Sequence, residues 1–274
     1  SYPPDLTIVG AIGLTKSRVT WKPPANHPND QPWFRVNSGN GIKFENFNFD
    51  GENRVKFGIH ASGSQYSFVD CWFRRFQDVS VLLLDAKAEG KGGAVFDRCR
   101  FVQENDPGNG WATGIQFGTG DGTCDGVVVR DCRFEGQHQA AIRFVAPTVR
   151  ATIERNRFYR SKNAFIAAKA EPARPLNANV LHNAFCDVQT GFKFETAPTN
   201  PQDGPFAISG NLFDNTKILC QTDGAQIAPK DWPGGTIWDR PIDPKVGVPQ
   251  GDVRRFRLNF DLPAGAPLPA ATLN

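Results

Sequence analysis

Two basic residues occupy matching positions in two copies of a short apolar motif. They are Arg143 in "AIRF" and Lys193 in "GFKF", and Gln116 takes the same place in "GIQF". Asp85 and Glu195 each stand two residues beyond the equivalent position of their own copies. A basic side chain beside carboxylates can hold an anionic ligand, and one that loses its proton becomes a general base. These residues predict a ligand site with Arg143 and Lys193 as catalytic groups, and scattered polar surface is the open alternative.

A glycine-rich loop at 118–126, "GTGDGTCDG", brings Asp121 and Asp125 close together. Carboxylate oxygens are ligands that Ca²⁺ prefers, so these two residues are candidate metal ligands. The loop lacks the spacing and the bidentate Glu of an EF-hand, which leaves an ordinary flexible loop as the alternative. The chain contains no C-x-x-C pair and no His/Cys cluster with the spacing of a zinc site.

The elements that must position these residues follow from an internal repeat. In each copy an apolar residue is followed two positions later by another, three later by Cys or Asn, and two later by Phe. The final Phe residues recur at intervals of 24 to 33 residues, which indicates a solenoid: Phe49, Phe73, Phe101, Phe134, Phe158, Phe185 and Phe213. A second short apolar run follows each copy. Two or three short strands per turn predict an all-β chain folded as a right-handed parallel β-helix of about eight coils.

The repeat also divides the chain. We expect residues 1–227 to form the β-helix, with a repeat core at 41–227 and a possible first coil at 6–40. In that first coil "LTIVGAIG" would place Ala11 at the Cys/Asn position. The repeat is lost after residue 227, so 228–274 is expected to be an irregular capping or flanking segment, which would cover open strand edges.

Inward positions should stack along the axis, because adjacent strands of a sheet lie about 4.8 Å apart. The seven Phe residues are expected in one inward column. Three Cys residues should be buried free thiols, since Cβ atoms about 4.8 Å apart exceed the usual disulfide range of about 3.5–4.5 Å: Cys71, Cys99 and Cys132. Three Asn residues continue the same ladder and can pass amide hydrogen bonds along it: Asn156, Asn183 and Asn211.

Outward positions form rows of two kinds. The residue before each Cys or Asn alternates in charge, which predicts a ladder of ion pairs: Asn46, Asp70, Arg98, Asp131, Arg155 and His182. A second alternating set is Asp97, Arg130 and Glu154. Arg100, Arg133 and Arg157 form a row of like charge instead. Such a row needs either flanking acids, such as Glu135, or an anionic partner.

The second apolar run gives the chemically mixed face that contains Arg143. We expect its outward row to be His60, Leu83, Gln116, Arg143, Ile166, Lys193 and Leu219. Two residues further along, the expected row is Ser62, Asp85, Gly118, Val145, Ala168, Glu195 and Gln221. Long insertions at 102–113, 118–126, 168–178 and 196–205 flank this strand, and a solenoid face between raised loops suits a polymeric ligand.

The repeat resembles that of the pectin-lyase-like β-helix superfamily over roughly Leu6 to Ile227. The phrase "FRLNFDLPAGAPLPA" at 256–270 is similar to the closing segment of many bacterial members. Lyases, hydrolases, epimerases and inert adhesins share this scaffold, so the resemblance implies a fold more than an activity. The Asp-Asp, Gly-His-Gly and Arg-Ile-Lys motifs of galacturonase-type hydrolases do not occur in the chain.

The resemblance implies a protein that handles a carbohydrate polymer, with a polysaccharide lyase or related enzyme acting on acidic polysaccharide as the catalytic form. A uronide lyase of this superfamily uses a Lys or Arg base, here Arg143 or Lys193, and a cation such as Ca²⁺ that neutralises the sugar carboxylate. Substrate-binding residues would be Asp85, Gln116 and Glu195, with Trp111 stacking on a sugar ring from its loop or folding back over the coil. The alternative is a non-catalytic β-helix that serves adhesion or accompanies a larger chain.

The composition limits the other classes. The net charge of +3 implies no bulk attraction to nucleic acid, and no apolar run approaches the length of a spanning helix. The chain begins at Ser1 and contains no Met, so we expect a processed or truncated product. A monomer that binds a polysaccharide is expected. By analogy with the superfamily it would be secreted, periplasmic or on the cell surface.

Overall fold

The computed structural model of the chain describes residues 6–10, 18–85, 93–104, 112–119, 123–145, 148–167, 176–195, 207–209, 211–222 and 225–226. The elements that it defines there are 25 β-strands. Within this part of the chain no helix is long and apolar enough to cross a membrane.

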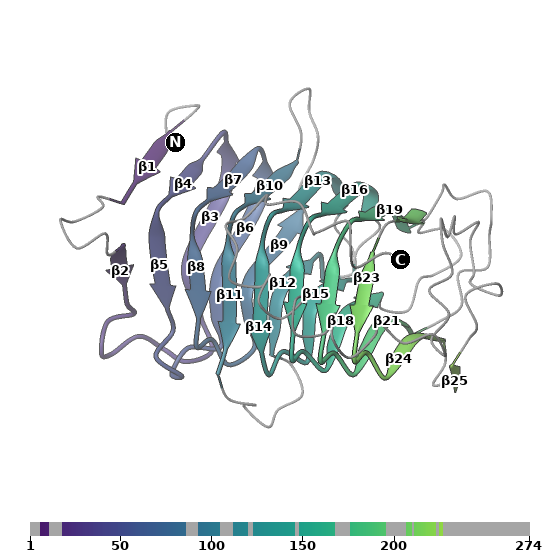
Figure 1. The fold of residues 1–274 in the computed structure, drawn as a ribbon. Helices are drawn as coiled ribbons and strands as arrows, with labels where there is room; N and C mark the ends of the chain where they lie inside the picture. Colours follow the sequence, from purple (N-terminus) through teal and green to yellow (C-terminus); the bar gives the residue numbers. More distant parts are fainter. Residues whose placement is uncertain are drawn as a thin grey trace.

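The strands form three sheets that run as three rows along one axis (Figure 1). Sheet A contains β1 (Thr7–Val9), β4 (Lys43–Glu45), β7 (Tyr66–Val69), β10 (Ala94–Asp97), β13 (Cys124–Arg130), β16 (Thr148–Glu154), β19 (Leu176–Leu181) and β22 (Ala207–Ser209). Sheet B contains β2 (Val19–Trp21), β5 (Phe47–Asp50), β8 (Trp72–Arg74), β11 (Arg100–Gln103), β14 (Arg133–Gly136), β17 (Arg157–Tyr159), β20 (Ala184–Cys186) and β23 (Leu212–Asp214).

Sheet C holds the second apolar run of each repeat. Its strands are β3 (Pro32–Asn40), β6 (Phe57–Ser64), β9 (Val79–Asp85), β12 (Thr113–Phe117), β15 (Ala140–Phe144), β18 (Asn163–Ala167), β21 (Thr190–Phe194), β24 (Ile218–Thr222) and β25 (Ala225–Gln226). All neighbours in this sheet pair in parallel except β24 and β25, which pair antiparallel.

The pairing confirms the predicted parallel β-helix. Each strand pairs with the strand three places later in the chain, as β4 does with β7 and β5 with β8. Three consecutive strands therefore make one coil, and the described chain passes eight times through sheet A and eight times through sheet B. The strands before the repeat core continue the sheets, because β1, β2 and β3 pair with β4, β5 and β6. Ala11 and residues 228–274 lie outside the described residues.

The core is built from stacked aromatic rings, as the repeat predicts. The seven final Phe residues form one inward column in which successive ring centroids are 4.5 to 5.0 Å apart. Six of the seven are completely buried, and Phe213 at the end is 7% exposed. Gly114 belongs to this packing, since a Cβ atom there would lie 3.1 Å from the ring of Phe134 and 2.6 Å from the carbonyl oxygen of Ala141.

The inward ladder of Cys and Asn residues is also confirmed. Cys71, Cys99 and Cys132 are buried and free. The backbone N–H of Asn156 donates to Oδ1 of Asn183 at 2.9 Å, and the N–H of Asn183 donates to Oδ1 of Asn211 at 2.8 Å. Each side chain thus satisfies the backbone of the coil before it, which removes the cost of burying these polar groups.

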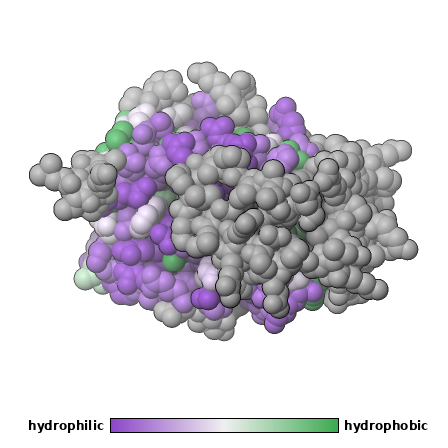
Figure 2. All heavy atoms as spheres, viewed as in Figure 1, coloured by the Kyte–Doolittle hydropathy of each residue, from purple (hydrophilic) through white to green (hydrophobic). Residues whose placement is uncertain are grey.

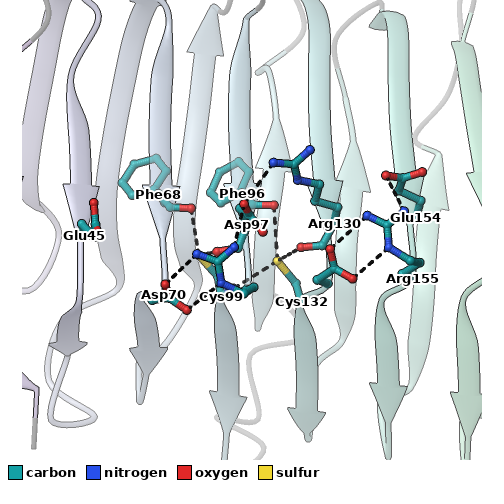
Figure 3. Close-up of polar contacts among 12 residues, drawn as sticks. Glu45, Phe68, Asp70, Phe96, Asp97, Cys99, Arg130, Cys132, Glu154 and Arg155 are labelled. Carbon is teal, nitrogen blue, oxygen red and sulfur yellow. Dashed lines mark hydrogen bonds and ion pairs between the residues drawn. The ribbon is translucent and has the colours of Figure 1, made fainter. Parts of the chain in front are cut away.

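A left-handed turn connects sheet A to sheet B in these coils. The residue before each Cys or Asn has a φ between 52° and 63°: Asn46, Asp70, Arg98, Asp131, Arg155 and His182. A non-glycine residue in this conformation costs about 1–2 kcal/mol. Of these turn residues, Asp70 and Asp131 each meet the turn arginine of the next coil (Figure 3).

The predicted ion-pair ladder forms at this turn. Arg98 binds both carboxylate oxygens of Asp70 at 2.8 and 3.0 Å, and Arg155 binds those of Asp131 at 2.9 and 3.0 Å. The second alternating set pairs in part: Arg130 lies 3.1 Å from the carboxylate of Asp97, whereas Glu154 pairs with Arg155 at 2.8 Å (Figure 3). Each exposed pair is worth about 0–1 kcal/mol, so the ladder offsets part of the cost of the turn.

On the face shown in Figure 2, the described surface is mainly hydrophilic. Within the described part of the chain, the exposed large apolar side chains are Val9 and Val19 in the first coil. Most other apolar residues of the described part are buried in the core.

Candidate functional site

The outward row of sheet C brings the main candidate residues into one line. Strand register pairs Gln116 with Arg143, Arg143 with Ile166, and Ile166 with Lys193. These four residues come from β12, β15, β18 and β21, and their neighbours in each strand, such as Ile115 and Ile142, point into the core. The alternation of a half-buried strand therefore places the polar member of each motif on the outside.

Two members of the predicted row were wrong. Register pairs Leu82, not Leu83, with His60 and Gln116, and Leu83 is completely buried. At the other end of the row Lys193 pairs with Gln221, not with Leu219. The outward row is therefore Arg35, His60, Leu82, Gln116, Arg143, Ile166, Lys193 and Gln221.

Arg143 is a largely enclosed charged residue of this row. Its side chain is 16% exposed, and its guanidinium lies 3.8 Å from the carboxylate of Glu195. Burial lowers the pKa of Arg143, and the negative charge of Glu195 acts in the opposite direction. The structure thus brings together two predicted site residues from strands that are two positions apart in the sheet. Such a pair presents a guanidinium and a carboxylate side by side to a ligand above this face.

Gln116 lies beside Arg143 on the next strand. Its side-chain amide donates a hydrogen bond of 3.0 Å to the carbonyl oxygen of Gly118, which has a φ of 76°. This turn at the end of β12 fixes the side-chain amide of Gln116 in place. The same contact sets the direction of the amide oxygen of Gln116. Gly118 therefore positions Gln116, whereas Gly114 serves the packing of the core.

Lys193 lies further along the row. One strand separates it from Arg143, so the two positions are twice about 4.8 Å, or about 9.6 Å, apart. Ile166 stands between them and is 5% exposed. Within the described residues Lys193 forms no ion pair, so its half-buried side chain can meet an external anion.

The remaining candidates are placed only in part. Asp85 is the last residue of β9, where its backbone pairs with Ser62. Asp125 accepts two hydrogen bonds from Arg150, at 2.9 and 2.7 Å, and this partner lowers the pKa of its carboxyl group. Trp111 and Asp121 lie outside the described residues. In the described part of the chain no three His, Cys, Asp or Glu side chains are grouped as metal ligands.

Sequence reasoning placed His60 in the outward row without naming it as a site residue, and it missed Arg35. Arg35 is exposed on β3 and pairs in register with His60 on β6. Burial, followed by the charge of Arg35, lowers the pKa of His60 to about 4, so its imidazole is neutral at pH 7. Its Nε2 atom is buried and has no hydrogen-bond partner. The sequence indicates the place of Arg35 only weakly, because β3 precedes the first clear copy of the repeat.

The arginine row on sheet B has different surroundings. Register stacks Arg100, Arg133 and Arg157 as predicted. Glu135 binds Arg100 through contacts of 2.5 and 3.1 Å, as the sequence suggested for a flanking acid. Arg100 also stacks on Trp72, with its guanidinium carbon 4.9 Å from the ring centroid. This part of the row is neutralised within the protein.

The row on sheet C therefore offers the better ligand site. It combines cations, a fixed amide, a carboxylate and a neutral imidazole along one face. Comparison of the chain with models of protein families found no match, and comparison with curated proteins found none either. The parallel β-helix is thus the level at which the chain can be classified.

Proposed function

We propose that the chain binds an acidic polysaccharide along the outward row of sheet C. The register that places Arg143 and Lys193 in one line is the observation that carries this proposal. Adjacent strands are about 4.8 Å apart, and one hexose unit of an extended polysaccharide has a similar length. A polymer that runs parallel to the axis of the helix can thus place carboxylates against both cations. Such polymers occur outside the cytoplasm, so the protein would be secreted, periplasmic or on the cell surface.

A lyase reaction is the catalytic form of this proposal. In a uronide the base takes the proton beside the carboxylate, and the electrons of that C–H bond form a C=C bond as the glycosidic C–O bond breaks. The leaving oxygen gains a proton. Arg143 would act as the base, since burial lowers its pKa. Lys193 would neutralise the carboxylate of the sugar.

A non-catalytic binding module is the second candidate. The carboxylate of Glu195, 3.8 Å from Arg143, favours the charged form of this guanidinium. A charged Arg143 binds anions but takes no proton. In that case the protein would hold the polymer as an accessory or adhesion domain.

Polysaccharide binding and turnover can be measured together. We would screen uronic-acid and neutral polysaccharides by calorimetry, by the ultraviolet absorbance of unsaturated products and by reducing-end release. Acidic polymers should bind, and neutral ones should not. Unsaturated products would support the lyase, and binding without turnover would support the module. A chain that binds no acidic polymer would refute both.

A pair of matched variants locates the site. Replacing Arg143 and Lys193 together by Gln removes two positive charges from sheet C. The control replaces Arg100 and Arg133 by Gln, which removes two charges from sheet B. The first variant should lose binding while the control keeps it, with both melting temperatures measured. Loss of binding in the control alone would show that the site lies on the arginine row.

A further inference from the structure

No two positive charges of the outward row on sheet C lie on neighbouring strands. The row begins at Arg35, and counting one strand at a time gives Arg143 as the fourth and Lys193 as the sixth residue after it. All three cations therefore fall on even steps, and the remaining even step is occupied by Leu82, which is 5% exposed. The odd steps are occupied by uncharged residues: His60, Gln116, Ile166 and Gln221.

The odd positions are uncharged for separate reasons. His60 is kept neutral by burial and by the neighbouring charge of Arg35. Gln116 is held by its hydrogen bond to Gly118. Ile166, 5% exposed, offers little surface between Arg143 and Lys193. A ligand that lies along this row would find cations at spacings that are multiples of about 9.6 Å, which is two strand separations.

A spacing of two strands is close to the length of a disaccharide in an extended chain. A homopolymer of uronic acid carries a carboxylate on each sugar, so every second carboxylate would face an uncharged position. A polymer in which acidic and neutral sugars alternate carries one carboxylate per disaccharide. In phase with Arg143 and Lys193, its carboxylates would meet three cations and face one uncharged position, Leu82. A homopolymer would face uncharged positions at five places along the same row.

We infer that the row selects a linear polysaccharide with one carboxylate per disaccharide, oriented along the axis of the helix. This inference rests on the proposed function of the same face. It predicts a preference against the general electrostatic trend, because a homopolymer of the same length carries twice the charge. Bulk attraction alone would favour the homopolymer.

The test compares two sets of oligosaccharides of equal length, one with alternating uronic acid and neutral sugars and one of uronic acid only. Binding is measured by calorimetry at physiological ionic strength. The alternating ligand should bind more tightly, by up to about fivefold for each matched carboxylate, which is the worth of an exposed ion pair of about 1 kcal/mol.

A charge-swapped variant provides the control. Gln116→Lys combined with Lys193→Gln keeps the number of charges but places two cations on neighbouring strands, at positions 116 and 143. Gln116 is only partly buried, so the fold should tolerate the change, and the melting temperature verifies this. The variant should lose the preference for the alternating ligand and bind the homopolymer better than the parent protein does.

The outcomes separate this inference from the proposed function. If the parent protein binds the homopolymer as tightly as the alternating ligand, the inference is wrong and the proposed acidic-polysaccharide site stands. The same holds if the charge-swapped variant keeps the parent preference. If neither acidic ligand binds, the proposed function fails as well.

Discussion

The backbone N–H of Cys132 donates to Oδ1 of Asn156 across 2.9 Å, and at this pair the thiol part of the inward ladder joins its amide part. One coil earlier the N–H of Cys99 donates to Sγ of Cys132 at 3.3 Å. A thiol sulfur is a weak acceptor, whereas an amide oxygen is a strong one. The hydrogen bonds of the ladder are therefore stronger on the Asn side of the Cys132–Asn156 pair than on the Cys side. Mutations can test this difference.

Asn156→Ala should lower the free energy of unfolding by about 1–3 kcal/mol, because it leaves the buried N–H of Cys132 without its acceptor. Cys132→Asn is the matched control, since it extends the amide ladder by one step. We expect its free energy of unfolding to stay within about 1 kcal/mol of the parent protein. Guanidinium unfolding of the three proteins measures both effects. Equal destabilisation by the two changes would contradict the difference between the two halves of the ladder.

Phe134→Ala should destabilise the protein by about 3–5 kcal/mol, because it opens a cavity in the centre of the aromatic column. Its ring stacks on Phe101 at 4.7 Å and on Phe158 at 5.0 Å between centroids. Val128→Ala is the control, since Val128 is a partly exposed residue on the outside of β13 and should cost less than about 1 kcal/mol. The column would not be the main source of stability if both variants lost the same free energy.

The thiols of Cys71, Cys99 and Cys132 should react slowly with alkylating agents in the folded protein. All three are buried, and burial raises the pKa of the Cys71 and Cys99 thiols, which suppresses the reactive thiolate. Mass spectrometry after timed labelling, with and without guanidinium, measures this protection. Rapid labelling of the native protein, or a disulfide among the three in the unreduced protein, would refute the predicted ladder of free thiols.

His138 should make the fold sensitive to acid. Its ring is buried, with Nε2 3.3 Å from the carbonyl oxygen of Phe101, and burial lowers its pKa from 6.5 to about 4. The unfolded chain therefore takes up a proton first as the pH falls. The contribution of His138 to the free energy of unfolding is fully present above about pH 6.5 and is lost as the pH falls toward 4. This difference in pKa corresponds to about 3 kcal/mol.

His138→Gln should flatten the decline of the unfolding free energy between pH 6.5 and 4. Urea unfolding at several pH values measures it, and the difference between parent and variant at pH 8 gives the packing effect of the substitution alone. His60 titrates in the same direction, so a smaller slope should remain in the variant. An unchanged slope would show that His138 does not couple folding to pH.

The core of the helix could be predicted because its pattern is one-dimensional. Each coil must repeat the spacing of the coil before it, so the column of Phe134 and the ladder of Cys132 follow from counting residues. The charge alternation of Asp70 and Arg98 is equally visible, since it recurs at a fixed offset from the ladder. The left-handed φ of these turn residues is not visible, because neither Asp nor Arg marks this conformation as glycine would.

Only the tertiary structure showed which residues of the sheet C strands point outward and which point into the core. In "VSVLLLD" three consecutive leucines carry no alternation, so the sequence could not choose between Leu82 and Leu83 as the outward residue. An irregularity between Ala61 and Ser62 also shifts the register at this point. Near Gln221, insertions of different length between the repeats likewise prevent the sequence from showing which residue points outward.

For the Phe column and the Cys and Asn ladder, the sequence by itself determined which residues stack, because burial and the distance between strands constrain these core positions. Only the tertiary structure decided which polar side chains meet. The contact between Arg143 and Glu195 spans two strands of the sheet, and the joining of Arg35 to the row depends on a strand that precedes the clear repeats. Outward side chains carry no packing constraint that repeats from coil to coil. Their partners are therefore set by register and by the reach of each side chain in space.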